Sequence, residues 1–182
     1  LDEDDETVVL TLGATPTNAT LGALTMHTLT ITDDDALPLV RFSAATSSTG
    51  EGNGVATVVV QLSAPSGRTV TVNYASTGGT AQGGGVDYTL APGTLTFDPL
   101  ETTHNITVTL IADASNEGNE TVLIGLTTPA GANATLGTPS THTLTLLDNL
   151  VLPTVQFAVD VSSISEGVTG GIANLTVTLS QS

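Results

Sequence analysis

The side chains of this sequence that could do chemistry are almost all carboxylates. The chain has 182 residues, of which 18 are Asp or Glu and only two, Arg41 and Arg68, are basic, so its formal net charge is −16. It has no Cys and no Lys, which removes thiolate metal sites, thiol catalysis, Schiff-base chemistry and the phosphate-binding P-loop. What remains is the chemistry of carboxylate oxygens, which are suited to binding hard divalent cations.

The same composition argues against several partners and activities. Neutralising phosphates requires clustered Lys and Arg, so neither a nucleic acid nor an anionic membrane surface is an expected partner. No apolar run reaches the roughly 20 residues of a membrane-spanning helix, so membrane insertion is not expected. His27, His104 and His142 form no credible Ser–His–Asp set, and His27 and His142 have the phase of core residues, whereas His104 is expected to be exposed. We therefore expect a protein that is not an enzyme.

An internal repeat organises the chain. Phe42 recurs 115 positions later as Phe157, and the string Ala19–Gly22 recurs unchanged at the same spacing as Ala134–Gly137. A fixed long period of this kind is typical of an array built from one structural unit.

The period divides the chain into one complete unit and two partial ones. We expect the C-terminal part of a preceding unit at 1–35, a complete unit at 36–149 and the N-terminal part of a following unit at 150–182. A partial unit cannot bury both faces of its strands, so we expect further sequence or a neighbouring copy to complete it. The predicted partners are neighbouring repeats of the same chain or identical subunits in a fibre.

The elements that must position the carboxylates are β-strands. The chain contains 35 Thr, 18 Val and 6 Ile, and these β-branched side chains favour strands over helices. Apolar and polar residues alternate in seven segments of the complete unit, with turn residues between them. The expected inward-facing residues are Val40, Phe42, Val58, Val60, Leu62, Val70, Val72, Tyr74, Leu95, Phe97, Ile106, Val108, Leu110, Val122, Ile124, Leu126, Leu144 and Leu146. The predicted fold class is all-β, with tandem seven-stranded immunoglobulin-like sandwiches.

This architecture predicts where the carboxylates meet. Strands of such a sandwich run alternately up and down, so the loops after the first, third, fifth and seventh strands lie at one pole. Two like charges about 4 Å apart repel by roughly 1 kcal/mol even in water, so a cluster there needs a cation. Ca²⁺ accepts many oxygen ligands in flexible geometry, whereas Mg²⁺ demands a tight octahedron; a solvated acidic face is the alternative. The predicted ligands in the complete unit are Glu51, Asp87, Asp113, Glu117, Glu120 and Asp148.

The repeat adds candidate ligands in the two partial units. Glu3 and Glu6 match Glu117 and Glu120, and an acidic triplet in the preceding unit begins at the counterpart of Asp148. The candidate calcium ligands outside the complete unit are therefore Glu3, Glu6, Asp33, Asp34, Asp35 and Glu166.

Several short motifs of this chain follow one another in an order typical of a known family. They are Ser165-Glu166-Gly167, Thr69-Val70-Thr71-Val72-Asn73-Tyr74-Ala75, Asp87-Tyr88-Thr89, Gly93-Thr94-Leu95-Thr96-Phe97, Glu117-Gly118-Asn119-Glu120-Thr121 and Ile31-Thr32-Asp33-Asp34-Asp35. Taken in this order, they resemble the Calx-beta domain family. The resemblance covers essentially the whole chain. It implies a Ca²⁺-binding β-sandwich whose ligand positions are the six carboxylates selected above.

The sequence departs from the family pattern at two ligand positions. Ala112-Asp113 stands where family members that bind several ions often have paired Asp, and Asp148-Asn149-Leu150 replaces the three Asp of the preceding unit. We therefore expect the complete unit to bind fewer Ca²⁺ ions than the preceding one, or to bind them more weakly.

Three functions fit these features. The first is a structural, Ca²⁺-stiffened repeat of an extracellular or cell-surface protein, such as an adhesin or a fibre, because the repeat, the absence of Lys and Cys and the lack of a catalytic set all agree with it. The second is a regulatory Ca²⁺ sensor, and the third is an accessory module of a large secreted enzyme.

Overall fold

The computed structural model describes residues 1–13, 16–113, 117–128, 131–148, 153–164, 167 and 174–180. Strands form nearly all of the regular structure in these residues, and the short 3-10 turn η1 spans Glu51–Asn53. No helix in the described part of the chain has the length and apolarity needed to cross a membrane. The all-β prediction is confirmed.

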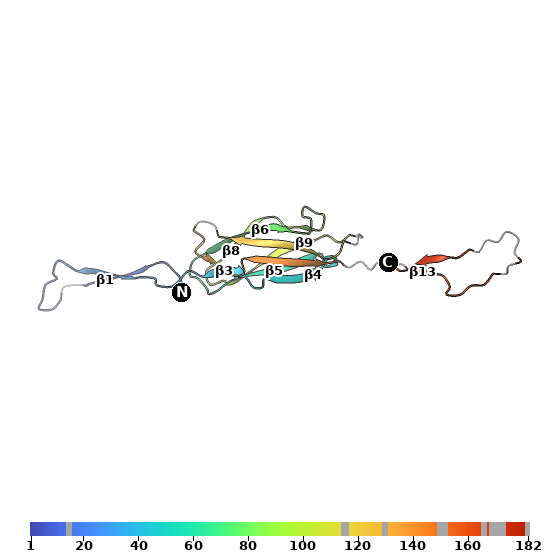
Figure 1. The fold of residues 1–182 in the computed structure, drawn as a ribbon. Coiled ribbons are helices and arrows are strands. Elements are labelled where there is room, and N and C mark those ends of the chain that lie inside the picture. Colours follow the sequence, from blue (N-terminus) through green and yellow to red (C-terminus); the bar gives the residue numbers. More distant parts are fainter. Residues whose placement is uncertain are drawn as a thin grey trace.

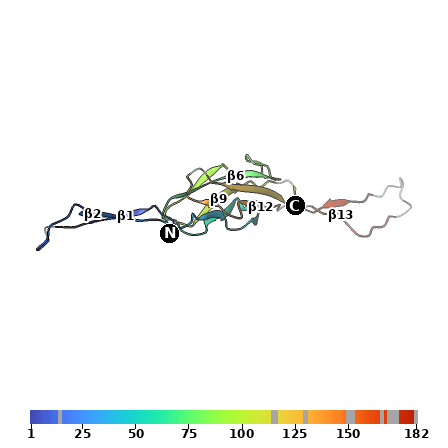
Figure 2. The same ribbon diagram turned by 60° about the vertical axis from the view of Figure 1, so that its left-hand side comes forward.

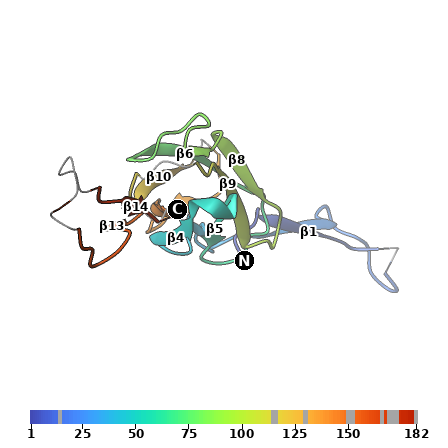
Figure 3. The ribbon, with the colours of Figure 1, turned by 90° about the vertical axis from the view of Figure 1, so that its right-hand side faces the viewer.

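Two five-stranded sheets form the central sandwich (Figure 1). The first has the order β4-β12-β10-β6-β8, with β4 at Thr46–Gly50, β12 at Thr141–Leu147, β10 at Glu120–Thr127, β6 at Val70–Gly79 and β8 at Gly93–Phe97. The second has the order β11-β3-β5-β9-β7, with β11 at Thr135–Leu136, β3 at Leu39–Phe42, β5 at Val55–Leu62, β9 at Thr103–Leu110 and β7 at Tyr88–Thr89. Neighbours are antiparallel except for the β4–β12 and β11–β3 pairs, which are parallel. Seen from one end, the two sheets enclose a common interior (Figure 3).

The core lies between the sheets and is built by the alternation that the sequence predicts. Val60 and Val108 from one sheet and Val72 and Val122 from the other are all 0% exposed. Threonines between the buried positions of β9 face outward, so the strand reads exposed and buried in turn. Sheet packing of this kind removes the apolar side chains from water, which is the main term that stabilises a sandwich.

All seven predicted strands are present, and three short strands are added to them. The segment Thr46–Gly50, predicted as a loop, is β4 and pairs in parallel with β12. His142 fixes this pair, since its Nε2 lies 2.7 Å from Ser47 Oγ and its Nδ1 lies 2.8 Å from the carbonyl oxygen of Ala44. With only 2% exposure, His142 is the core residue that the sequence predicted.

His104 differs from the prediction of an exposed side chain. Its side chain is 33% exposed, and its ring packs edge-on against Phe97 with the ring centroids 4.7 Å apart. Its Nε2 also lies 3.1 Å from a carboxylate oxygen of Glu101. The aromatic contact is the reason for the partial burial.

A two-stranded hairpin lies at each end of the sandwich (Figures 1 and 2). One consists of β1 at Glu6–Thr11 and β2 at Met26–Ile31, and the other of β13 at Val155–Phe157 and β14 at Val177–Leu179. Every residue of these four strands is exposed. The predicted division at 36 and 149 stays a prediction, although the change from exposed hairpin to buried core lies between β2 and β3.

Candidate metal centre

The carboxylates predicted at one pole of the sandwich come together there. Glu51 opens η1 after β4, and Asp87 precedes β7; Asp113 follows β9, while Glu120 opens β10 and Asp148 follows β12. The charges of Asp148, Asp113, Glu117 and Asp87 all act on Glu51, and those of Asp87, Glu117 and Glu51 act on Glu120. Four segments distant in sequence, of which the β9–β10 connection carries Asp113, Glu117 and Glu120, therefore place six carboxylates in one electrostatic cluster.

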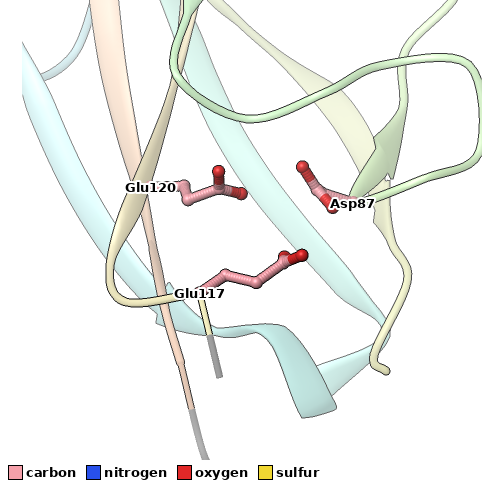
Figure 4. Close-up of side chains that lie close together, drawn as sticks. All are labelled: Asp87, Glu117 and Glu120. Carbon is pink, nitrogen blue, oxygen red and sulfur yellow. The ribbon is translucent and has the colours of Figure 1, made fainter. Parts of the chain in front are cut away.

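Three of these side chains form the centre of the cluster. Asp87, Glu117 and Glu120 each offer one carboxylate oxygen, and these oxygens all lie within 4.8 Å of one another. Figure 4 shows the three side chains pointing toward a common point, Glu117 and Glu120 from the connection that leads into β10 and Asp87 from the loop on the other side. Oxygens at this separation can contact one ion at the 2.3–2.6 Å typical of Ca²⁺ ligands.

The end of β6 holds Glu120 in place. Gly79 has a φ of +123°, and a Cβ built on it would lie 2.0 Å from the carbonyl oxygen of Thr121, so only glycine allows this close approach. The Thr121 amide donates to Thr80 Oγ1 at 2.9 Å, and the Ala81 amide donates to the Thr121 carbonyl at 3.0 Å. These contacts fix the backbone next to Glu120.

Backbone hydrogen bonds also fix Asp87, which is only 7% exposed. Its carboxylate accepts from the Gln82 amide, and its own amide donates to the Gln82 carbonyl at 3.0 Å. The Ile111 amide donates to the Asp87 carbonyl at 2.8 Å, which ties the loop to the end of β9. Tyr88 anchors the next position, with its hydroxyl 2.7 Å from Ser76 Oγ.

Glu51 contributes an oxygen that lacks a hydrogen-bonding partner. Its Oε1 is buried and, within the described residues, forms no hydrogen bond. A buried carboxylate oxygen in this state is costly, because it has lost its water without a replacement. A cation would supply the missing interaction.

Burial and neighbouring negative charges raise the pKa values of three glutamates in the cluster. Burial, followed by a hydrogen bond with Asp87 and by neighbouring negative charges, raises the pKa of Glu120 to about 7. Burial and then the charge of Asp148 raise the pKa of Glu51, whereas the charge of Asp113 is the main cause of the raised pKa of Glu117. Each shift means that the folded protein disfavours the ionised carboxylate unless positive charge is added.

Asp148 connects the cluster to the chain that leaves the sandwich. Its amide donates to Asn119 Oδ1 at 3.3 Å, and its Oδ2 accepts from the Gly118 amide at 3.4 Å. The end of β12 is thereby tied to the loop before β10, which carries Glu117 and Glu120.

The donor set fits Ca²⁺. It consists of carboxylate oxygens from several loops, with no thiolate and no imidazole among the six residues, and it includes the orphaned Glu51 oxygen. Hard oxygen donors in number are typical of Ca²⁺ and not of softer transition metals.

The candidate ligands of the first 35 residues lie in a different setting, at the opposite pole. Arg68 Nη2 lies 3.3 Å from Asp33 Oδ2 and 3.2 Å from Asp2 Oδ1. The Glu3 amide also donates to Asp33, and Asp35 pairs with the N-terminal amine. Hydrogen bonds from the amides of Asp35 and Glu3, together with the Arg68 charge, lower the pKa of Asp33. A guanidinium thus already supplies positive charge to these carboxylates.

Among the described residues, the other candidates of the partial units do not form a second centre. Glu6 opens β1 opposite Ile31. The described part of the first 35 residues holds no group of three acidic side chains as close as Asp87, Glu117 and Glu120. Glu166 lies outside the described residues.

Sequence reasoning missed the residues that position the ligands. Gly79, Thr80, Thr121 and Asn119 support the carboxylates without any chemical motif of their own, although Asn119 and Thr121 do belong to the Glu-Gly-Asn-Glu-Thr string. The role of Arg68 was also missed. Its rarity, as one of only two basic residues in an acidic chain, was the available signal.

Comparisons with known proteins identify the family of this chain. The model of the Calx-beta domain matches residues 33–150. Sodium/calcium exchanger 1 of Bos taurus is 32% identical over 127 residues, which cover 70% of this chain and 13% of the exchanger. Sodium/calcium exchanger 3 of Mus musculus is 34% identical over 111 residues, covering 61% of this chain and 12% of that protein. The chain therefore spans about an eighth of the length of these curated relatives.

Solved structures share the fold. The apo-form Calx CBD1 domain has a TM-score of 0.58 at 24% identity and covers 63% of this chain and 99% of its own. The calcium binding domain CBD12 of CALX1.1 has a TM-score of 0.56 at 26% identity and covers 60% of this chain and 44% of its own. The predicted β-sandwich is confirmed, and with a family model that matches well over half of its length, the chain belongs to the Calx-beta domain family.

Proposed function

We propose that this chain is a Ca²⁺-binding structural repeat of an extracellular surface protein, adhesin or fibre, and that Ca²⁺ stiffens the junction between its units. One observation carries the proposal. Six carboxylates from four segments of the chain converge at the pole from which the chain leaves the sandwich after Asp148. A family relative of known structure is described as a calcium binding domain, which supports the choice of ion.

The physical case for Ca²⁺ rests on uncompensated charge. The raised pKa values of Glu51, Glu117 and Glu120 mean that the folded protein at neutral pH bears a penalty for ionising them. Ca²⁺ would neutralise that charge and accept the orphaned Glu51 oxygen. Binding energy available only in the folded form stabilises that form.

The location of the site supports a stiffening role. Asp148 is the last described residue of the central unit, and the next described segment begins at Pro153. An ion held by Glu120, Asp87 and Asp148 would fix the direction in which the chain departs toward β13. In this proposal the ion therefore stiffens the junction between consecutive units.

The opposite pole suggests how consecutive units meet. Asp2 is 4% exposed and forms a parallel bridge with Ser66, whose Oγ lies 2.6 Å from Asp2 Oδ2. The Gly67 amide donates to the Asp2 carbonyl at 2.8 Å. In our proposal this contact is where one unit docks on the pole of the next, and Arg68 assists the ion or replaces it there.

The extracellular setting follows from the ion and the composition. Weak carboxylate sites fill at the millimolar Ca²⁺ of extracellular fluids, for which dissociation constants of about 10⁻⁴–10⁻³ M suffice. The chain lacks Cys, so Ca²⁺ would take the stabilising role that disulfides have in many secreted proteins. The partners in this proposal are neighbouring repeats or identical subunits.

A second candidate function is Ca²⁺ sensing. The similarity to sodium/calcium exchangers favours it, since a sensor is a module within a larger protein. A sensor requires a dissociation constant near micromolar and a conformational response, whereas a structural repeat requires only that the site be filled. A third function, an accessory module of a large secreted enzyme, would use the same site. Only sequence outside this chain would distinguish it from the first two.

Calorimetric titration of the 182-residue chain with Ca²⁺, together with small-angle scattering in Ca²⁺ and in EDTA, tests the proposal. We expect dissociation constants weaker than about 10 μM, a higher melting temperature with Ca²⁺ and a larger, more variable radius of gyration in EDTA. Submicromolar binding with a large conformational change would favour the sensor. No heat of binding and identical scattering profiles would overturn both.

A further inference from the structure

The outer face of the sheet β4-β12-β10-β6-β8, which is turned away from the core, is almost free of charge. Its five strands contain no Asp, Lys or Arg, and their one Glu is Glu120, at the pole of carboxylates. The other carboxylates of the central unit lie in the connections between strands. In a chain with a net charge of −16, this sheet therefore offers a broad neutral surface.

A hollow of about 590 Å³ lies in this face, and we call it the sheet trough. Its volume is within the range of about 300–1,000 Å³ that is usual for ligand sites. Ala75 of β6 and Gly125 of β10 form its floor and pair with each other, and Thr141 of β12 pairs with Gly125 on the other side. The trough exists because Ala75 and Gly125 carry at most a methyl group, whereas the residues around them have longer side chains.

A β-bulge shapes one end of the trough. The pairing of β6 with β10 shifts in register between Leu123 and Ile124, so Thr77 is an extra residue in β6. The Thr77 hydroxyl donates to the Leu123 carbonyl at 3.3 Å, and a Cβ on Gly125 would lie 2.8 Å from Thr77 Cγ2. The absence of a side chain at Gly125 therefore lets Thr77 lean over β10. Bulges are common beside functional sites, where they redirect a side chain.

Hydrogen-bonding side chains line the trough. The Thr94 hydroxyl of β8 donates to Asn73 Oδ1 of β6 at 2.7 Å, which orients the Asn73 amide. Among the described residues, neither the Asn73 side-chain nitrogen nor the hydroxyls of Thr127, Ser140 and Thr141 have a hydrogen-bonding partner. The trough therefore presents a free amide donor and three hydroxyls that can both donate and accept.

This lining indicates the chemical class of the ligand. Of the described residues, none that lines the trough is charged, so an ionic ligand would find no counterion there. Strands β6 and β10 each have a neighbour on both sides, so their backbone groups are used within the sheet, whereas peptides are bound by strand addition at a sheet edge. Uncharged donors and acceptors, with Ala75 and Pro92 as apolar contacts, suit the hydroxyl groups and C–H faces of a sugar.

We propose that the sheet trough binds a neutral oligosaccharide. Asn73 and Thr141 hydrogen-bond to its hydroxyls from either side of β10, and the floor of Ala75 and Gly125 lets a sugar ring approach the sheet. An open site with few side-chain contacts binds weakly, with a dissociation constant of about 1 mM. In an array each unit presents one trough, and simultaneous contacts with one polysaccharide multiply the affinity.

This inference rests on one element of the proposed function, the repetition of the unit, because weak sites gain strength only in an array. None of the residues that line the trough is a proposed calcium ligand. The two proposals can therefore fail separately. A chain that binds Ca²⁺ but no neutral sugar overturns the trough alone, and a chain that binds a neutral sugar but no Ca²⁺ overturns the metal alone.

Nuclear magnetic resonance titration of the isotope-labelled 182-residue chain provides the test. The probes are cellopentaose, mannopentaose, maltopentaose and galactopentaose, with a pentagalacturonate as the anionic comparison and a neutral Gly-Ser-Thr peptide as the peptide comparison. We expect a neutral sugar to shift the amides of Asn73, Gly125 and Thr141, with an affinity that does not change with salt because the site is uncharged. No shift of these amides with any neutral sugar at about 10 mM, or shifts with the pentagalacturonate or the peptide alone, would overturn the proposal.

Three variants locate the site. Ala75→Phe places a ring in the trough and should abolish the shifts while leaving Ca²⁺ affinity unchanged. Thr141→Ala removes one hydroxyl and should weaken sugar binding by about two- to tenfold. Thr143→Ala is the matched control and should leave sugar affinity unchanged, since Thr143 lies on the same strand but does not line the trough. Equal sugar affinity in the wild type, Ala75→Phe and Thr141→Ala would mean that the sugar binds elsewhere and that the proposal is wrong.

Discussion

Glu120 and Asp87 hydrogen-bond to each other across the two sheets of the sandwich. Glu120 opens β10 in one sheet, and Asp87 lies directly before β7 in the other. The contact joins two carboxyl groups, so the hydrogen bond exists only while Glu120 is protonated, and the raised pKa of Glu120 reflects this. If the proposed site binds Ca²⁺, a proton and the ion should compete for it, which leads to the first two predictions.

The stability of the Ca²⁺-free protein should fall as the pH rises from about 4.5 to about 7. The folded pKa of Glu120 is raised from 4.5 to about 7, so the folded state binds more protons than the unfolded state in that window. The free energy of unfolding then decreases with pH, and the loss is complete above the folded pKa. Thermal melts in EDTA should show a fall of several degrees between these pH values. Saturating Ca²⁺ should remove or reverse it, and a pH-independent melt in EDTA would contradict the shift.

Glu120→Gln should separate metal binding from folding. The amide cannot ionise, so the variant in EDTA at pH 8 should melt at a higher temperature than the wild type in EDTA. The same change removes a charged ligand and should weaken Ca²⁺ binding at least about tenfold in calorimetry. Glu101→Gln, at the opposite pole, is the control and should leave affinity unchanged. Wild-type affinity in Glu120→Gln would show that Glu120 is not a ligand.

Gly79→Ala should damage the site from a distance. The added Cβ would lie 2.0 Å from the Thr121 carbonyl oxygen at a φ of +123°, so β6 must move away from the residue that follows Glu120. We expect a loss of several kcal/mol in unfolding free energy and weaker Ca²⁺ binding. Gly84→Ala is a sharp control, because Gly84 also has a positive φ but a Cβ there meets no atom within 4 Å. Equal effects of the two variants would mean that backbone strain, and not the close approach, explains the result.

The pole of carboxylates was predictable because it follows from alternation alone. Inward-facing residues such as Val58 and Ile106 identify the strands, and the direction of each strand decides which loops meet at one pole. This is enough to place Asp113 and Asp148 at the same pole without detailed geometry. The local supports were not predictable in this way. Strand β4 lies in a Ser/Thr-rich run with no apolar alternation, so its parallel pairing depends on the buried partner His142.

The contact of Arg68 with the N-terminal carboxylates was hidden for another reason. It joins segments far apart in sequence, and neither has a periodic pattern that could reveal it. The sequence predicted that Asp33 would serve a metal, whereas the structure places an arginine beside it. Binding of Ca²⁺ by Asp33 and its neighbours stays a prediction made from the repeat.

Arg68→Met should release the N-terminal segment from the sandwich. The side chain of Asp2 is 3% exposed, and Arg68 Nη2 lies 3.2 Å from its carboxylate. Without the guanidinium, Asp2 keeps a nearly buried charge supported mainly by Ser66, and an uncompensated buried charge of this kind costs about 3–5 kcal/mol. Methionine retains much of the aliphatic stem, so the change removes charge more than packing.

The Gly67 amide, which donates to the Asp2 carbonyl, reports on the contact: its hydrogen exchange should be slow in the wild type and much faster in the variant. Arg41→Met removes the other basic side chain, on β3, and should leave Gly67 exchange unchanged. Slow exchange of Gly67 in Arg68→Met would mean that the backbone bridge between Asp2 and Ser66 holds the segment without the ion pair.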